Sequence, residues 1–224
     1  ATGNTFTYAP AADCTVAVEL WGKEQEVTLE CGDGGTASVT DPARYGETIT
    51  ITATPEAGYV VDAITVQGAE NALYENTAKA NGVQTAEYAI TAGTTFAITF
   101  SRKPVVTFSA SNGSLTASGT VDGAAANLTS GGYVDFGSAV AFTAVPSRGY
   151  TLEGWYVDGA PIAQTALTYT TAALSGDVSV EARFAATTDI PVQYAVNDPA
   201  MGTITATADG SSFQSGDLLA GGQK

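Results

Sequence analysis

The residues of this chain that could do chemistry are limited in kind, and histidine is absent from all 224 positions. Without an imidazole, neither a Ser-His-Asp nor a Cys-His catalytic arrangement can form, and histidine cannot ligate a metal. The two cysteines, Cys14 and Cys31, are too few ligands for a thiolate metal centre and do not form a C-x-x-C redox motif. The sequence therefore predicts no catalytic residue, no cofactor and no metal ligand.

Acidic side chains are abundant, but their spacing suits neither a calcium loop nor a glycosidase pair. Eight Lys and Arg stand against 23 Asp and Glu, for a formal net charge of −15. No Asp-x-Asp or Asp-x-Asn run occurs, and several Asp residues instead precede Gly, as they do in turns. Small modules also offer little concavity for two facing carboxylates. We expect a non-enzymatic, acidic protein with no nucleic-acid partner, because a basic footprint is missing.

The two cysteines can be placed opposite each other by one antiparallel register. A hairpin across residues 14–31 pairs its apolar positions on a single face. The pairs are Leu20 with Gln25, Val18 with Val27, Val16 with Leu29 and Cys14 with Cys31. We expect a disulfide, which favours an oxidising, extracellular compartment; the alternative is two buried free thiols in a cytosolic protein.

Aromatic and lysine side chains provide two further candidate sites. Trp155 with Tyr156, and the turn-flanking Tyr59 and Tyr150, could stack on a sugar. Core packing is the preferred interpretation, because Ile64 stands at the repeat position of Trp155 and a stacking platform does not accept Ile. An intramolecular Lys–Asn bond needs a lysine buried among apolar groups. None is expected, because no lysine lies inside an alternating apolar strand: Lys23, Lys79, Lys103 and Lys224.

The elements that must position these residues have a period of two. Apolar Ile49, Ile51 and Ala53 alternate with threonines, and Val140, Phe142 and Ala144 do the same, which predicts half-buried strands. The Pro-x-x-Gly segments 55–58 and 146–149 fit four-residue hairpin loops. One short helix is considered in the insertion 69–80. We therefore expect an all-β fold of small antiparallel β-rich modules, sandwich or β-grasp-like, with at most that one helix.

Internal repeats divide the chain. Residues 46–59 align without a gap with residues 137–150, an offset of 91, and residues 8–20 align with 88–100, an offset of 80. Val27-Thr28-Leu29 followed by Gly34 corresponds to Val106-Thr107-Phe108 followed by Gly113. The expected divisions are the tail of a preceding repeat that forms a hairpin with the next one (1–22), repeat units 1 (23–103) and 2 (104–188), and the head of an incomplete third (189–224).

Two motifs of these units carry a family resemblance. Gly137 to Trp155 has the form Gly-x-x-Val-x-Phe-x-Ala-x-Pro-x-x-Gly-Tyr-x-x-x-x-Trp, and an alternating strand ending in Phe184 follows it. This pattern resembles the divergent internalin-type B-repeat, the "bacterial repeat" module of large surface proteins. Its structural positions here are Pro55, Gly58, Tyr59, Ile64, Pro146, Gly149, Tyr150 and Trp155. The resemblance implies an extracellular array of β-rich modules, commonly stalks or adhesin segments.

The expected function follows from this resemblance. We expect a non-catalytic spacer or stalk of a bacterial cell-surface or adhesin-type protein. The alternatives are a module array that binds a host glycan or protein, and an accessory β-domain of a secreted enzyme. No apolar run approaches the length of a membrane span. Residues 5–20 and 191–224 match parts of different repeats and would lack a central segment if joined between copies, so we expect a slice of a longer array that behaves as a monomer.

Overall fold

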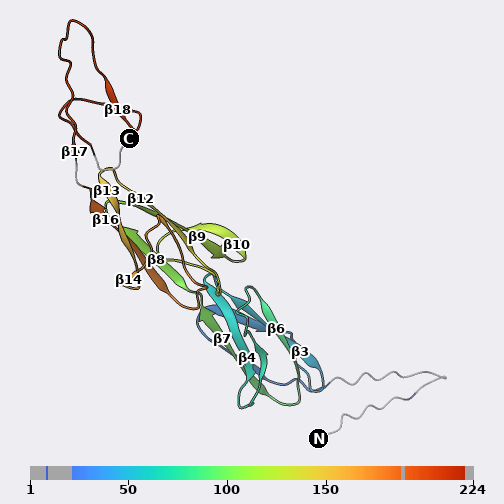
Figure 1. Ribbon diagram of the computed structural model, residues 1–224. Helices are drawn as coiled ribbons and strands as arrows, with labels where there is room; N and C mark the ends of the chain where they lie inside the picture. Colours follow the sequence, from blue (N-terminus) through green and yellow to red (C-terminus); the bar gives the residue numbers. More distant parts are fainter. Residues whose placement is uncertain (1–8, 10–21, 188–189, 220–224) are drawn as a thin grey trace.

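The structure is a computed structural model that describes residue 9, residues 22–187 and residues 190–219. Over these residues it consists of strands and turns without a helix, which confirms the all-β expectation. The insertion considered for a helix instead holds a short strand (Ala72–Glu75) and a turn. Figure 1 shows an elongated molecule in which two sandwich-like bodies lie end to end.

We call the first of these bodies module 1 and define it by its seven strands. They are β1 Val27–Cys31, β2 Gly35–Val39, β3 Thr48–Pro55, β4 Tyr59–Val66, β5 Ala72–Glu75, β6 Gln84–Ala89 and β7 Thr94–Arg102. One sheet has the order β1-β7-β4-β5 and the other β2-β3-β6. Alternate residues of both sheets form a single core, which makes the module a β-sandwich.

We call the second body module 2, and its strands repeat this arrangement with two additions. They are β8 Val105–Ala110, β9 Gly113–Val121, β10 Ala124–Leu128, β11 Gly132–Tyr133, β12 Ala141–Pro146, β13 Tyr150–Val157, β14 Ala160–Ile162, β15 Thr168–Thr170 and β16 Val178–Ala186. The sheets are β11-β8-β16-β13-β14 and β10-β9-β12-β15. Apart from β10 and β11, the strand order is that of module 1.

Irregularities recur at equivalent positions of the two modules. The ladder between β4 and β7 shifts register between Val61 and Ala63, and the ladder between β13 and β16 shifts between Leu152 and Gly154. Both shifts lie at the repeat offset of 91 residues. A β-bulge at the same place in both modules supports a common origin of the two sheets, because bulges are specific features of a fold.

The Pro-x-x-Gly segments do not close hairpins, so that prediction was wrong. β3 pairs with β2 and β6, whereas β4 pairs with β5 and β7, and the turn at residues 55–58 therefore crosses from one sheet to the other. The turn at residues 146–149 does the same between β12 and β13. The turn chemistry holds, since Gly58 and Gly149 have φ of 81° and 84°. The strands on either side of each turn have both edges paired with other strands, so they do not pair with each other.

In each module the strand after the first turn begins with a glycine that lies beneath an aromatic ring. Gly35 pairs with Pro55 and Gly113 with Pro146, so Gly35, and not Gly34, is the counterpart of Gly113. A Cβ on Gly35 would lie 2.3 Å from the ring of Phe100. A Cβ on Gly113 would lie 2.6 Å from the ring of Phe184. The space under these rings admits only a backbone.

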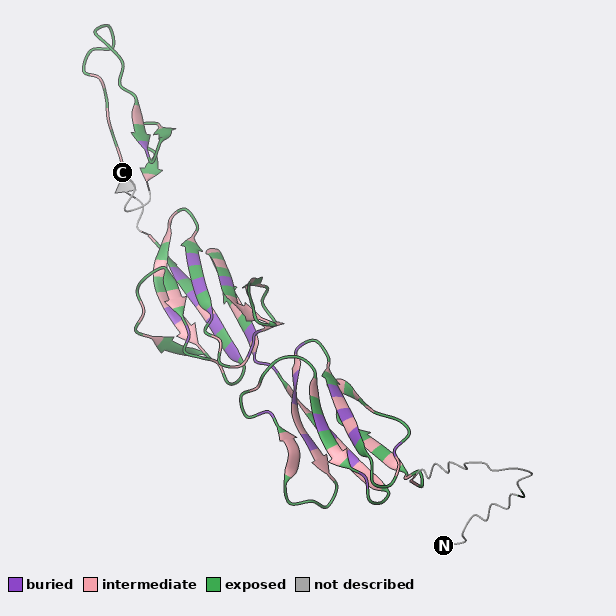
Figure 2. Cartoon of the chain, turned by 90° about the vertical axis from the view of Figure 1, so that its right-hand side faces the viewer, coloured by how far each residue is buried: buried purple, intermediate pink, exposed green. Residues whose placement is uncertain are grey.

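Two separate apolar cores support the modules, and buried stripes alternate with exposed ones along the strands (Figure 2). In module 2, Phe142, Trp155 and Tyr169 form an aromatic cluster, with Phe142 and Tyr169 rings stacked at 6.1 Å. In module 1 the equivalent of Trp155 is Ile64, and both are fully buried. The smaller side chain of module 1 is accommodated in a core with a different aromatic pair, Tyr88 and Phe96.

Residues 190–219 form two small strand pairs. β17 (Ile190–Pro191) pairs with β20 (Leu218–Leu219), and β18 (Ala206–Ala208) pairs with β19 (Ser211–Phe213). The edge-to-face contact of Tyr194 with Phe213 joins them, with ring centroids 5.8 Å apart. No helix among the described residues is long and apolar enough to cross a membrane.

Candidate functional site

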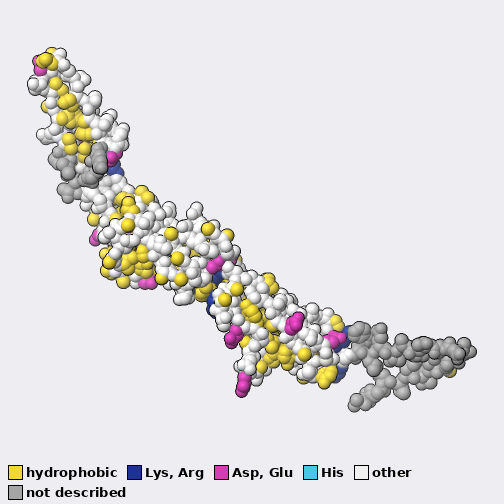
Figure 3. Space-filling model, turned by 45° about the vertical axis from the view of Figure 1, so that its right-hand side comes forward, with side chains coloured by type: hydrophobic (Ala, Val, Ile, Leu, Met, Phe, Trp, Pro, Cys, Tyr) yellow, Lys and Arg dark blue, Asp and Glu magenta, His cyan; other side chains and the backbone are white. Residues whose placement is uncertain are grey.

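The best-defined cluster of charged side chains lies where the two modules meet. Figure 3 shows basic and acidic side chains close together where module 1 meets module 2. A shallow groove of about 390 Å³ opens there, lined by Tyr59 and Asn81 of module 1, by the connecting Lys103 and by Asp122 of module 2, among others. We call this region the junction, and Lys103 lies at its centre between β7 and β8.

Lys103 is a lysine withdrawn from solvent. Its side chain is 2 % exposed, and its Nζ lies 2.5 Å from Oδ1 of Asp122 and 2.8 Å from Oδ1 of Asp135. Burial alone disfavours the ammonium, but the bonds to the two carboxylates outweigh it and raise the pKa of Lys103 above its ordinary value. The ring of Tyr133 lies 5.3 Å from the same nitrogen. The ammonium is therefore held charged inside the junction.

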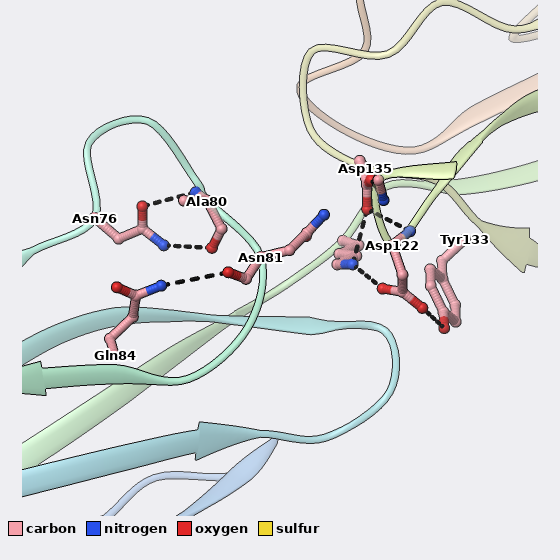
Figure 4. Close-up of polar contacts among 9 residues, drawn as sticks. Asn76, Ala80, Asn81, Gln84, Asp122, Tyr133 and Asp135 are labelled. Carbon is pink, nitrogen blue, oxygen red and sulfur yellow. Dashed lines mark hydrogen bonds and ion pairs between the residues drawn. The ribbon is translucent and has the colours of Figure 1, made fainter. Parts of the chain in front are cut away.

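Asp135 is the buried acid of the cluster. Its carboxylate accepts hydrogen bonds from the backbone N–H groups of Asp122 and Gly123, at 3.1 and 2.7 Å. Burial opposes ionisation, yet the bonds from Lys103, from the Gly123 amide and from Asn81 hold the pKa of Asp135 below its ordinary value. Figure 4 shows the amide of Asn81 approaching this cluster from module 1.

The Asp122-Gly123 turn completes the pocket around the ammonium. Both residues have positive φ, 50° and 82°, which the β9–β10 hairpin requires and which Asp and Gly tolerate. The turn aims the Asp122 carboxylate at Lys103, and the Tyr133 hydroxyl donates to its other oxygen at 3.1 Å. β10 and β11, the strands that module 1 lacks, bring these groups to the junction.

Module 1 closes the junction with two loops. The Lys103 N–H donates to the carbonyl of Gly58 at 2.8 Å, and the Tyr133 ring packs against the same Pro-x-x-Gly turn. The loop after β5 carries Asn81 and also Lys79, whose Nζ lies 5.9 Å from the Phe136 ring centroid. This loop begins inside the insertion 69–80 and extends beyond it to Asn81. It is held by Asn76, whose amide donates to the carbonyls of Val61 and Ala80.

A second ion pair braces the junction at the start of β8. Arg102 donates to Oδ2 of Asp177 at 2.7 Å, and the other oxygen of Asp177 accepts the Val105 N–H at 2.8 Å. The bond from Arg102 and that from Val105 lower the pKa of Asp177. This pair is half exposed, so its own contribution to stability is small. It links the end of β7 and the start of β8 to Asp177, the residue before β16.

Sequence reasoning missed the junction, although one signal could have located it. Lys103 lies between β7 and β8, outside any apolar strand as expected, but nothing in the sequence indicates its burial, because its cover comes from distant loops. The repeat offsets place Lys103 at the position of Glu24, and Asp135 at that of Arg44. Glu24 and Arg44 also form a bridge and an ion pair at 4.0 Å. The alignment of the repeats thus shows an acid and a base at these two positions in both units, with their signs exchanged, and this indicates an ion pair between them.

The predicted motif residues occupy structural positions. Trp155 is fully buried and its indole N–H donates to the carbonyl of Ala166 at 2.8 Å, so this ring has no face available for a sugar. Tyr59 packs over Gly34, where a Cβ would lie 2.3 Å from its ring. Tyr150 packs on the core of module 2. Tyr156 is the exception, because its ring faces outward under the guanidinium of Arg183 at 3.7 Å.

The predicted disulfide stays a prediction. Cys31 is a free, exposed cysteine at the end of β1. Partial burial of its thiol raises the pKa of Cys31 above its ordinary value. Cys14 and the predicted strand 14–20 lie outside the described residues. By the repeat offset, the strand 14–20 corresponds to β7, and its predicted hairpin partner β1 corresponds to β8. In the structure β7 and β8 are not hydrogen-bonded to each other. Counting thiols in unreduced protein checks the pairing.

No candidate metal site is found in the described part of the chain. There, no group of three or more Cys, Asp or Glu side chains could hold a metal ion. The cation at the junction is the protein's own lysine.

Comparison with known proteins gives one match. The family model described as the divergent InlB B-repeat domain matches residues 25–97 and 104–188. Neither the curated proteins nor the solved structures gave a match. The first matched region covers module 1 as far as the start of β7, and the second covers all of module 2.

Proposed function

The chain belongs to the divergent InlB B-repeat family, and on that premise we propose that it is a non-catalytic spacer of a bacterial cell-surface protein. The family suggests a repeat region of such a protein, located outside the cell. The finer proposal is a stalk whose role is to hold its neighbours apart at a defined distance and angle. Its repeat units are 23–103 and 104–188, as the two strand sets suggest.

The junction is the observation that carries the proposal. A spacer must transmit orientation from one module to the next, and flexible contact between modules is the ordinary case unless the interface is well fixed. Lys103 is bonded by Asp122 and Asp135 of module 2 and by the Gly58 carbonyl of module 1. The Gly58 carbonyl and the Asn81 side chain of module 1 both bond to this buried cluster, and a change of angle that removes these bonds leaves buried polar groups unsatisfied, which is costly. The junction therefore favours one inter-module angle.

A third unit is proposed for residues 189–224. The antiparallel pair β17–β20 corresponds to the pair β8–β11 of module 2, and the β18–β19 hairpin corresponds to the β9–β10 hairpin. Its Asp209-Gly210 turn has φ of 47° and 78°, matching the Asp122-Gly123 turn of module 2. These parallels support the head of another repeat.

Binding of a host glycan or protein is the second candidate, and the surface gives it less support. Large apolar side chains that are exposed are spread over the described chain and not gathered into one patch: Tyr45, Val83, Val145, Leu167, Met201, Ile204 and Leu218. Tyr45 is the one aromatic ring among them. The observation in favour of binding is Tyr156 with Arg183, an outward aromatic and a cation on one face.

Solution scattering and a glycan array together test the proposal. A spacer gives the scattering profile of a monomeric rod whose length does not change with added sugars, and no array hits. A compact particle, or saturable binding that Tyr156→Ala abolishes, overturns the spacer in favour of a binding array. Glu153→Ala serves as the matched control, because Glu153 is another side chain of β13 outside the core.

A further inference from the structure

Each module has its entry and exit strands as parallel neighbours. β1, the first strand of module 1, pairs with β7, the last, from Val27↔Thr94 to Cys31↔Ile98. In module 2, β8 pairs with β16 in the same way, from Val106↔Val178 to Ala110↔Ala182. The other ladders of both modules are antiparallel. The parallel pairing is thus confined to the two strands through which the chain enters and leaves.

This arrangement determines how a pulling force acts on the module. Tension along the chain pulls β1 at the Val27 end and β7 at the Arg102 end, which is the opposite end of their shared ladder. The strands are therefore loaded in shear, parallel to each other, and their inter-strand bonds run across the force. All bonds of the ladder must then fail together, whereas a ladder peeled from one end loses them one at a time.

We infer that the β1–β7 and β8–β16 ladders are shear clamps that make each module resist mechanical unfolding. The inference rests on the proposed stalk role, because only a chain held at both ends carries tension. It goes beyond that role by assigning load-bearing to two specific ladders. The junction places the clamps in series, since Arg102, at the end of β7, is followed within three residues by Val105, at the start of β8.

The hydrogen bonds at the two ends of the ladder identify which amides belong to the clamp of module 1. Thr94 N–H donates to the carbonyl of Glu26, and Gly32 N–H donates to that of Ile98, at 3.0 and 2.9 Å. Alternate residues of a parallel strand face the same neighbour, so the N–H groups of Thr28 and Glu30 also face β7. Both side chains are exposed. A proline at Thr28 therefore removes a clamp bond without removing a core side chain.

The same module offers a matched control outside the clamp. Ser38 lies on β2, with an exposed side chain, and is paired with Thr52 of β3. The neighbouring bond from Thr40 N–H to Thr50 O sets the phase of that antiparallel ladder, so the Ser38 N–H faces β3. Ser38→Pro therefore also deletes one ladder bond of module 1, in a strand that carries no end-to-end load.

The two clamps differ in their support. β8 is bonded on both sides, by β16 and by β11, whereas within the described residues β1 has β7 as its one ladder partner and only the Glu24–Arg44 bridge beside it. We expect module 1 to unfold first under load. A variant in β1 should then shift the weaker of two unfolding events and leave the stronger unchanged.

Single-molecule force spectroscopy on the full chain tests the clamp by pulling direction. Handles are attached in a background in which Cys14 and Cys31 are Ser. The shear geometry uses Lys23→Cys with Ala186→Cys, so that both ladders are loaded end to end. The peeling geometry uses Lys23→Cys with Ala92→Cys, both at the Val27–Thr94 end of the first ladder. Forced unfolding reports the barrier to unfolding, which is the quantity that a clamp raises.

The expected result is a several-fold higher unfolding force for module 1 in shear than in peeling. Thr28→Pro lowers the shear force of the weaker event, while Ser38→Pro leaves it near that of the parent chain despite a comparable loss of stability to urea. Equal forces in the two geometries, or equal effects of the two prolines, overturn the clamp. A rod that keeps its length in solution while the clamp fails leaves the spacer role standing, so the two failures are distinguishable.

Discussion

The Nζ of Lys103 and Oδ1 of Asp135 lie 2.8 Å apart in module 2, at the positions that Glu24 and Arg44 occupy in module 1. The sign of each charge is exchanged, but the pairing is kept. In module 1 the pair is more exposed, with the Glu24 side chain 70 % accessible. In module 2 it is covered by the preceding module. The same position of the repeat is thus a surface ion pair in one unit and a junction in the next.

Replacing Lys103 with Met should destabilise module 2 strongly. The substitution keeps the length of the side chain but leaves the Asp135 carboxylate buried without its cation, a change that costs about 3–5 kcal/mol. Urea unfolding followed by the fluorescence of Trp155, in a Trp21→Phe background, measures the loss. The double variant Lys103→Met with Asp135→Asn should recover much of it, because it removes both charges. A single variant as stable as the parent contradicts a buried ion pair.

The stability of module 2 should fall in acid with the titration of Asp135. The folded-state pKa of this carboxyl lies below the unfolded value of about 3.9, so its contribution is complete above that value and is lost as pH falls through the folded-state pKa. The titration of Lys103 should lower the stability of module 2 at the alkaline end of the pH range. Its pKa is raised, so its contribution is complete below about pH 10.4 and is lost as pH rises through the folded-state pKa.

Urea midpoints across the pH range check both limbs. Asp135→Asn should flatten the acid limb, because the amide does not titrate. An acid limb of the same depth in the parent and in the Asn variant would show that other carboxylates carry the effect.

Lys103→Thr should loosen the angle between the modules. Thr187 occupies the equivalent position at the end of module 2, where its N–H donates to Gly149 O at 2.8 Å, as Lys103 does to Gly58. The Thr187 hydroxyl is buried and, among the described residues, has no hydrogen-bond partner. A threonine at position 103 has no ammonium and should therefore lose the ion pairs to Asp122 and Asp135.

Distances between spin labels on Glu87→Cys and Ser147→Cys, one in each module, measure this change. The native Cys14 and Cys31 are replaced by Ser. The distribution should be narrow in the parent and broader with Lys103→Thr. Lys23→Thr, an exposed lysine away from the junction, should leave it unchanged. A distribution unaffected by Lys103→Thr means that the loops of module 1 fix the angle without the ion cluster.

Gly113→Ala should destabilise module 2 by about 1–3 kcal/mol, the cost of overpacking. The added Cβ would lie 2.6 Å from both the Phe184 ring and the Val145 carbonyl, and the backbone cannot move away without breaking the β9–β12 ladder. Gly154→Ala is the control, since a Cβ there meets nothing within 4 Å. Thermal unfolding compares the two. Equal stability of both variants would contradict the close approach beneath Phe184.

By itself the sequence determined the elements and their repetition. Alternation of Ile49, Ile51 and Ala53 with threonines encodes which side of a strand faces the core, because side chains in a strand have a period of two. The offset of 91 residues carries that pattern to module 2, and the Gly58 and Gly149 positions mark where the chain turns. The family and the all-β class follow from these local signals.

Tertiary structure alone decided which edges meet. Periodicity does not say which strand lies beside which. It therefore predicts a hairpin at the Pro-x-x-Gly turn, which in fact joins two sheets, and it gives no sign of the parallel pairing of the entry and exit strands. The burial of Lys103 is of the same kind. Its cover comes from Gly58, Asn81, Asp122 and Asp135, which are near it only once two modules have folded and met. The local sequence encodes which side chains face the core, whereas long-range contacts decide which strands and loops lie against one another.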